Sequence, residues 1–221
     1  MIRIYVKYEQ VKAGDKVKFE FSHMHYITKV MRKQNEDKIL IFNEKIGEWI
    51  VKINNSYGIV QNQTRKYKIQ RRPNLAIACI KKPRMEWMIE KITELNVNEI
   101  YILQTQYSQN SYLDIRRLQR IMEEAAEQSN RISVPTLHCS QSLQCFIQKI
   151  DMKNWVALHP KATHSATSLN NFDGILIGPE GGWSETELSY FQNKVSIHSN
   201  ILRSETAACA ALSIWNFNFI A

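Results

Sequence analysis

The chain has 221 residues, of which 44% are hydrophobic and 23% charged, enough apolar material for one ample core or two modest ones. It has no apolar run near the roughly 20 residues that cross a bilayer, so composition excludes a membrane-spanning protein. The N-terminus lacks the basic, apolar and small-residue regions of a secretory signal, and we therefore expect a cytoplasmic protein.

Positive charge is concentrated in the first third of the chain. Residues 1–72 contain 16 Lys and Arg against 7 Asp and Glu, a net charge of +9, whereas residues 73–221 contain 13 and 14, a net charge of −1. A basic segment joined to a near-neutral one indicates that the first part meets a polyanion while the second has another task. The alternative is a lysine-rich surface without such a partner.

The cysteines give no sign of a disulfide framework or a metal site. They form no Cys-x-x-Cys pair and lie in apolar or mixed surroundings, at Cys79, Cys139, Cys145 and Cys209. We expect reduced, buried thiols.

Residues 1–70 are predicted to form a small antiparallel sheet or barrel. The candidate strands, several of which alternate apolar and polar residues, are residues 2–6, 16–21, 38–42, 48–53 and 57–60. Turn sequences at residues 13–15 and 45–47 separate them. A helical turn around residues 22–32 interrupts the strands.

This helical turn places cations beside an aromatic ring. On a helix, His25, Lys29 and Arg32 fall on one side, with Tyr26 and Val30 adjacent. Cations next to an aromatic side chain suit phosphate contact and base stacking. His25 taken alone is equally typical of an ordinary surface.

After Pro73 the pattern changes to apolar strands that alternate with amphipathic helices. The predicted strands are residues 75–80, 100–103, 155–158 and 175–177. A helix after Pro83 has one apolar face, formed by Met85, Met88, Ile89, Ile92 and Leu95. Alternating βα units predict a parallel sheet with helices on its faces, which is an α/β domain.

The strand at residues 175–177 leads into a glycine-rich segment. Three of the 7 glycines fall within residues 178–182, and Ser184 with Glu187 forms a capping box that starts the next helix. Loops at the carboxyl ends of parallel strands bind ligands in open α/β sheets, and glycine lets main-chain groups come close. The acidic Glu180 disfavours phosphate and favours an uncharged or cationic ligand. A tight turn that only caps the helix is the alternative.

A second apolar stretch turns into a helix at Ser204. Arg203 and Glu205 flank this boundary. They could hold a substrate, or they could equally pair with each other.

A third polar set lies at the end of an amphipathic helix. Glu124, Gln128 and Arg131 stand at positions i, i+4 and i+7, so the spacing predicts one shared stripe. A solvated face is the simpler account of it.

Taken together, the segments described above and their order along the chain resemble those of the RsmE-type 16S rRNA (uracil-N3) methyltransferases of the SPOUT superfamily. The resemblance extends over nearly the whole chain. The most diagnostic pair is L-I-G-P-E-G-G at residues 176–182 and L-R-x-E-T-A at residues 202–207. Further matching segments are residues 25–32, 85–97, 124–131 and 158–160.

The resemblance implies a PUA-like RNA-binding β-barrel at residues 1–70 and a SPOUT methyltransferase domain at residues 73–221. In this α/β fold the C-terminal chain would form a deep trefoil knot. The implied reaction is methylation of N3 of a specific uridine in 16S rRNA of the small ribosomal subunit, by a homodimer that uses S-adenosyl-L-methionine and no metal. The alternatives are a non-catalytic RNA-binding or ribosome-assembly factor, and a SPOUT enzyme that acts on another RNA.

For this reaction we assign hypothetical roles to individual residues, and the matching family segments imply which residues surround the methyl donor. Arg203 would stabilise the uracil as it becomes anionic, and Glu205 would orient Arg203 or accept the N3 proton. The residues expected around the methyl donor are Leu158, Leu176, Gly178, Glu180, Gly181, Gly182 and Leu202. The cations expected on RNA are His25, Lys29, Arg32, Arg71, Arg72 and Arg131.

Two segments depart from the family pattern. Asn96 replaces the Gly of Glu-Leu-Gly-Val, and Asn accepts the left-handed conformation that Gly would adopt. Residues 197–200 stand where the family usually has a Leu-Gly pair, so we expect this loop to be reshaped.

Overall fold

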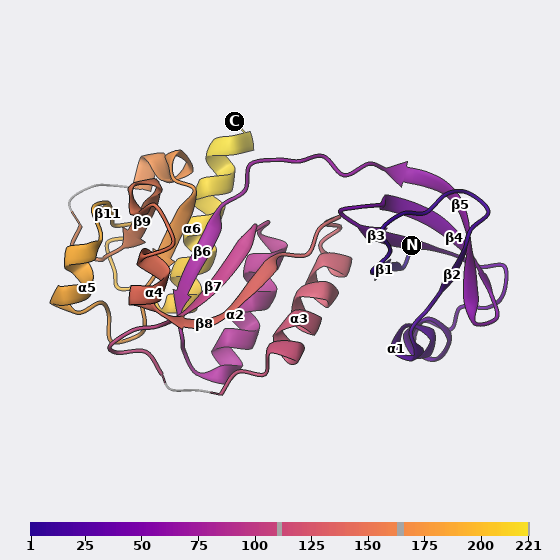
Figure 1. The fold of residues 1–221 in the computed structure, drawn as a ribbon, viewed down its shortest axis with the longest axis horizontal. Helices are drawn as coiled ribbons and strands as arrows, with labels where there is room; N and C mark the ends of the chain where they lie inside the picture. The colour runs from indigo at the N-terminus through magenta and orange to yellow at the C-terminus, as the bar shows by residue number, and fades with distance from the viewer. Residues whose placement is uncertain (110–111, 163–165, 221) are drawn as a thin grey trace. The chain divides into compact units, whose positions relative to one another are not determined.

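The computed structural model describes residues 1–109, 112–162 and 166–220. The chain divides into two compact units, one formed by Met1–Gln70 with Ala126–Val134 and the other by Arg71–Ala125 with Pro135–Ala221. Within the described ranges, no helix has the length and apolar character needed to cross a membrane. Figure 1 shows the ribbon of both units.

The first unit is built on a five-stranded sheet with the order β1-β3-β4-β5-β2. The strands are β1 (Arg3–Tyr5), β2 (Lys16–Lys18), β3 (Lys38–Asn43), β4 (Gly47–Asn54) and β5 (Tyr57–Arg65). Most pairs are antiparallel, as predicted, but β1 pairs with β3 in parallel. The reason is that the chain crosses the sheet after β1 to form β2 at the far edge before it returns to β3.

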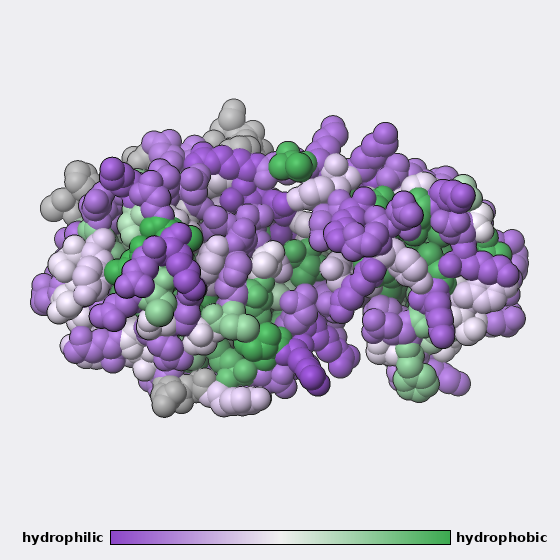
Figure 2. All heavy atoms as spheres, in the orientation of Figure 1, coloured by the Kyte–Doolittle hydropathy of each residue, from purple (hydrophilic) through white to green (hydrophobic). Residues whose placement is uncertain are grey.

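A short helical segment separates β2 from β3, as predicted. It consists of α1 (Phe21–His25) followed directly by a π-helical turn, η1 (Tyr26–Val30). Ile27 is its buried residue and joins the apolar core of the sheet. On the face of the first unit that Figure 2 shows, most of the surface is hydrophilic, in keeping with the charge of this part of the sequence.

A buried ion network ties Ala126–Val134 to the first sheet. Arg3, only 7% exposed, donates from Nε to Glu48 Oε2 and from Nη2 to the Arg131 carbonyl, both at 2.8 Å. Arg65 donates to the same carboxylate, with Nη2 2.6 Å from Oε2. Burial alone would raise the pKa of Glu48, but hydrogen bonds from Arg65 and Arg3 outweigh this effect and lower the pKa to about 2.

The second unit contains a six-stranded parallel sheet with the order β11-β9-β10-β6-β7-β8, which confirms the predicted α/β architecture. The strands are β6 (Asn74–Ala78), β7 (Glu99–Gln104), β8 (Thr136–Ser142), β9 (Trp155–Leu158), β10 (Gly174–Ile177) and β11 (Lys194–Val195). The apolar pattern does not predict β8 or β11. Both are edge strands. The pattern misses β8 because its residues are partly or fully exposed, and it misses β11 because that strand has only two residues.

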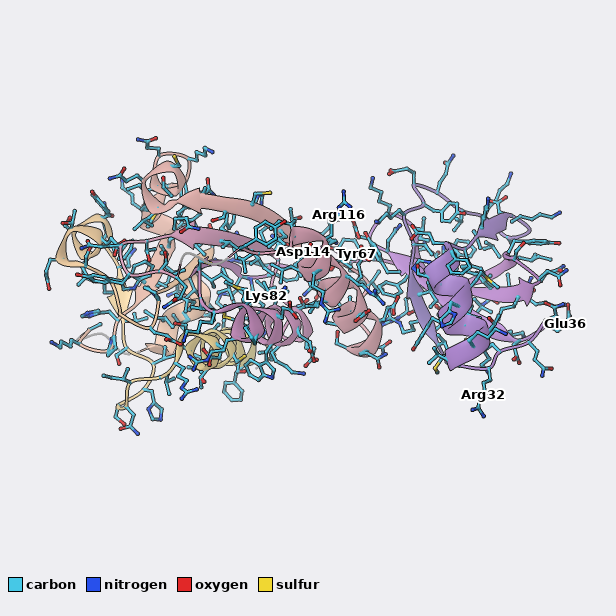
Figure 3. All side chains as sticks on the ribbon, turned by 90° about the horizontal axis from the view of Figure 1, so that it is seen from below. Arg32, Glu36, Tyr67, Lys82, Asp114 and Arg116 are labelled. Carbon is cyan, nitrogen blue, oxygen red and sulfur yellow. The ribbon has the colours of Figure 1, made fainter. Side chains whose placement is uncertain are left out.

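Helices cover both faces of this sheet. They are α2 (Lys82–Glu94), α3 (Ile115–Gln128), α4 (Leu143–Ile147), α5 (Glu185–Tyr190) and α6 (Ser204–Ile220), with the 3-10 turns η2 (Met152–Asn154) and η3 (Ala166–Asn171). Figure 3 shows α2 and α6 side by side, and α6 also packs on β10. On the other face, Phe146 of α4 packs with Trp155 and Trp183 in a second apolar cluster.

Local sequence signals in α2 hold in the structure. Met85, Met88, Ile89 and Ile92 are buried, as predicted, whereas Leu95 at the C-cap is partly exposed. Asn96 follows with φ +67°, the left-handed conformation expected of it.

The expectation of buried thiols is wrong for two cysteines. All four are free, and Cys79 is buried, but Cys139 and Cys145 are exposed. Cys139 lies on β8, which is at the edge of the sheet and has a neighbouring strand on one side only. Cys145 lies on α4, which follows directly after β8.

Replacing Glu48 is expected to destabilise the first unit. Glu48→Gln leaves the buried charge of Arg3 without its counter-ion, so the free energy of unfolding at pH 7 should fall by about 3 kcal/mol. The folded carboxyl has its pKa lowered from 4.5 to about 2, so its contribution is complete above pH 4.5 and is lost as the pH falls toward 2. Urea unfolding followed by circular dichroism should therefore depend less on pH in the variant over this window.

Glu9→Gln is the matched control, because Glu9 pairs with Lys45 at the surface. Its free energy of unfolding should change by less than about 1 kcal/mol. Equal losses in the two variants would contradict the role given to the buried network.

Candidate functional site

The glycine loop, residues 178–184, joins β10 to α5 at the carboxyl edge of the sheet. β10 is buried along its whole length. At the other end of the loop the predicted capping box is present, with Ser184 Oγ accepting from Glu187 N at 3.3 Å and Glu187 Oε2 accepting from Ser184 N at 2.9 Å. Both ends of the loop are therefore fixed.

The loop depends on its glycines. A Cβ on Gly178 would lie 3.0 Å from Cε2 of Trp183, and one on Gly181 would lie 2.9 Å from Cβ of Tyr107. Gly182 has φ +76°, where an L side chain is strained. The main chain here thus approaches aromatic side chains too closely for larger residues.

The Leu202 segment, residues 201–206, is anchored to the glycine loop. Ser204 Oγ donates to the Gly178 carbonyl at 2.7 Å. Because α6 begins at Ser204, its first turn is held against the end of β10. The helix start predicted at this residue is confirmed.

An arginine from α2 connects the two segments. Arg84 forms ion pairs with Glu180 of the glycine loop and with Glu205 of the Leu202 segment, the latter with 3.8 Å between Nε and Oε1. Glu205 is 8% exposed, and its Oε2 has no hydrogen-bond partner among the described residues. A buried carboxylate oxygen of this kind suits a cationic or hydrogen-bond-donating ligand.

Arg84 is a site residue that sequence reasoning missed. It lies in the first turn of α2, soon after the carboxyl end of β6, and β6 is the neighbour of β10 in the sheet. The available signal was this position after a parallel strand, because loops at that edge converge on one site.

Arg203 and Glu205 do not pair with each other, so that alternative is wrong. Glu205 pairs with Arg84. The Arg203 side chain is exposed, and no ion pair or side-chain hydrogen bond is described for it within residues 1–109, 112–162 and 166–220.

The other residues expected around the methyl donor differ in how far they are buried. Leu158 ends β9, and its carbonyl accepts from Trp183 Nε1 at 3.1 Å, so it lies against the glycine loop. Leu176 is fully buried inside β10 and packs in the core. Leu202 is partly exposed.

The cations expected on RNA fall into two groups. His25, Lys29 and Arg32 are exposed on the helical segment of the first unit and just after it. Arg71 is already engaged, pairing with Asp173 at 2.9 Å between Nη2 and Oδ1. Arg72 is partly buried.

The stripe predicted for Glu124, Gln128 and Arg131 is not formed. α3 ends at Gln128, and Asn130 then turns the chain with φ +64°. Arg131 is only 9% exposed, and its carbonyl is bonded by Arg3. Helical spacing alone could not reveal where this helix stops.

The loop that departs from the family pattern is closed by its own side chain. Asn200 N donates to His198 Nδ1 at 2.9 Å, and Ser196 Oγ donates to the His198 carbonyl at 3.1 Å. A histidine thus stabilises the turn in a segment without glycine.

Comparisons with known proteins agree with this arrangement. The family model for an RNA methyltransferase domain matches residues 68–216, and the model for an RNA methyltransferase PUA domain matches residues 24–56. Ribosomal RNA small subunit methyltransferase E of Rickettsia conorii is 33% identical over 207 residues, which cover 86% of this chain and 85% of that protein.

Two solved structures share the fold. A Legionella pneumophila protein in complex with the cofactor SAM has a TM-score of 0.85 and 24% identity, over 98% of this chain and 97% of that one. Ribosomal RNA small subunit methyltransferase E of Neisseria gonorrhoeae, bound to S-adenosyl methionine, has a TM-score of 0.85 and 20% identity, over 99% and 98%.

Proposed function

We propose a methyl-transfer reaction for this chain, which belongs to the RNA methyltransferase family that includes ribosomal RNA small subunit methyltransferase E. The methyl group comes from S-adenosyl-L-methionine and is transferred to ribosomal RNA of the small subunit. The acceptor in our proposal is N3 of one uridine. The observation that carries the proposal is the junction of the glycine loop with the Leu202 segment, bridged by Arg84.

The residues at this junction fit a methyl donor with a positively charged sulfur. Glu205 offers a buried carboxylate oxygen without a described partner, and Glu180 and Glu205 together outnumber the one cation, Arg84, that bridges them. When bound, the donor supplies an electrophilic methyl group. The main chain around Leu158, Gly178, Gly181, Gly182 and Leu202 would hold its adenosine and methionine parts.

Arg203 and Glu205 are the proposed catalytic pair. N3 of uracil must lose its proton to become a nucleophile, and the base must be unpaired or flipped out to be reached. Arg203 is exposed beside the junction and would stabilise the negative charge that develops on the base. Glu205 pairs with Arg84 and not with Arg203, so of its two roles we propose proton acceptance and not orientation of Arg203.

The helical segment of the first unit is the proposed RNA-binding surface. His25, Lys29 and Arg32 are exposed on this segment and just after it, and Phe21 at its start is 89% exposed. Cations beside an exposed ring can bind phosphates and stack on unpaired bases. Arg71 and Arg72, which belong to the second unit, are proposed as further cations that contact RNA, whereas Arg131 is buried and acts through its carbonyl inside the first unit.

A trefoil knot and a homodimer complete the proposal. The sheet order, in which β9 lies between β11 and β10, supports a knot formed by the chain from β9 to α6.

In a homodimer the partner subunit would complete the substrate pocket, and the reaction on ribosomal RNA would take place in the cytoplasm. Light scattering should then give twice the mass of one 25.9 kDa chain; a mass of one chain would contradict the dimer.

Arg203→Ala is expected to remove turnover and spare RNA binding. Loss of a group that stabilises developing charge should lower kcat by about 100-fold or more, while the Kd for small-subunit RNA changes by less than about twofold, since one surface cation is lost among several. The assay is methyl incorporation into unmodified small-subunit ribosomal RNA, with nucleosides identified by mass spectrometry.

The paired variant Lys29→Ala/Arg32→Ala should behave in the opposite way. RNA affinity should fall, and the slope of log K against log salt should flatten by about 1.4 to 1.8, because two phosphate contacts are lost. Turnover at saturating RNA should stay unchanged.

The result that would overturn the proposed mechanism is full turnover by the Arg203→Ala variant together with normal RNA binding.

A further inference from the structure

An exposed aromatic side chain lies on the glycine loop. Tyr107 is 47% exposed, and a Cβ built on Gly181 would lie 2.9 Å from its Cβ and 3.4 Å from its Cγ. Gly181 is itself exposed. The base of the Tyr107 side chain is therefore in contact with the main chain of the loop, while much of the residue faces solvent.

The sheet order explains how a residue that follows β7 reaches a loop that follows β10. β6 lies between these two strands, so the segments after the three parallel strands are neighbours at one edge of the sheet. Gln109 N donates to the carbonyl of Cys79, the residue directly after β6, at 2.9 Å. Tyr107 thus extends across the end of β6 to Gly181.

The segment that carries Tyr107 is held by hydrogen bonds on both sides of it. Gln106 N donates to Oε1 of the buried Glu187 at 2.8 Å. Thr105 N donates to Ser108 Oγ at 3.0 Å, and that hydroxyl donates to the Thr105 carbonyl at 2.9 Å. The main chain at Tyr107 is therefore fixed before any ligand binds, which lowers the entropy lost on binding.

Packing against Gly181 does not require an aromatic residue. The nearest atom of Tyr107 is Cβ, which every residue except glycine has. At the other end of the side chain, the hydroxyl accepts from Nε2 of the exposed Gln106 at 3.4 Å. The ring between these ends is available to a ligand that stacks on aromatic side chains, and unpaired nucleobases are ligands of this kind.

We propose that Tyr107 stacks on the uracil that accepts the methyl group. This inference rests on the proposed function. N3 of the acceptor must come within about 3–3.5 Å of the methyl carbon, so the flipped-out base must lie against the loop that holds the donor. Tyr107 presents an exposed ring on that loop. Stacking on it would hold the base in place for the transfer.

Removing the ring tests the stacking directly. Tyr107→Ala keeps the Cβ that contacts Gly181, so its Kd for S-adenosyl-L-methionine, measured by calorimetry, should equal that of wild type. Its Kd for small-subunit ribosomal RNA should rise by about fivefold or more, the effect of one lost stacked base, while Tyr107→Phe keeps the ring and should stay within about twofold of wild type. An unchanged Kd for RNA in Tyr107→Ala would overturn the inference.

An RNA that lacks the acceptor base tests which base is stacked. Mass spectrometry of RNA methylated by the wild-type chain locates the acceptor, and a synthetic fragment is then made with an abasic ribose at that position. The losses of affinity caused by the abasic site and by Tyr107→Ala should not add, because both remove the same contact. Methyl transfer with fully additive losses would overturn this inference alone, whereas absence of methyl transfer by the wild-type chain would overturn the proposed function as well.

Tyr112→Ala is the matched control. Tyr112 is a tyrosine of the same unit that is 88% exposed and takes part in none of the contacts described above. Its Kd for RNA should equal that of wild type. A loss as large as that of Tyr107→Ala would show that the effect does not depend on the position of the ring at the glycine loop, and would overturn the assignment.

Discussion

The ion pairs of Arg84 with Glu180 and Glu205 are the interaction on which the site depends. They join the glycine loop to the Leu202 segment, and the hydrogen bond from Ser204 Oγ to the Gly178 carbonyl joins them a second time. Each ion pair is partly exposed, so its own contribution to the free energy of folding is small. Together they fix the end of β10 against the start of α6, so that one buried carboxylate oxygen and the main chain of a glycine turn are held at the same place. This is the place at which we propose that the cationic methyl donor binds.

The first unit uses charge in two different ways, at its surface and in its interior. The first unit carries the excess of Lys and Arg and exposes His25, Lys29 and Arg32. Its interior uses charge differently, because Arg3, Glu48 and Arg65 form a network whose carboxyl stays ionised at low pH. That network binds the Arg131 carbonyl and so incorporates the end of α3 into the first unit. Arginine thus stabilises the fold inside the unit and is proposed to bind RNA at its surface, and burial distinguishes the two uses.

Local signals were sufficient for the parts of the fold that local physics determines. The capping box joins Ser184 and Glu187, which are only three residues apart in the sequence. The left-handed conformation of Asn96 follows from its small polar side chain. The buried strands of the second sheet follow from continuous apolar runs. Edge strand β8 has no such run, because solvent covers residues that a neighbour would otherwise bury. The position of Arg84 after a parallel strand could have indicated a site residue, but its partners could not be identified from sequence, since they are about 100 residues away and only the sheet order brings them together. Arg131 was misplaced for a related reason: its burial depends on a contact with Arg3.

The most direct test of the account is hydrogen–deuterium exchange of the wild-type chain with and without S-adenosyl-L-methionine. Amide exchange reports on the main chain itself, which is the part of the glycine loop that we expect to hold the donor. The account expects slower exchange in peptides that cover residues 178–184 and 201–206, and no change in residues 38–65 of the first sheet. Identical exchange in both of those loops, with and without the donor at saturating concentration, would contradict it.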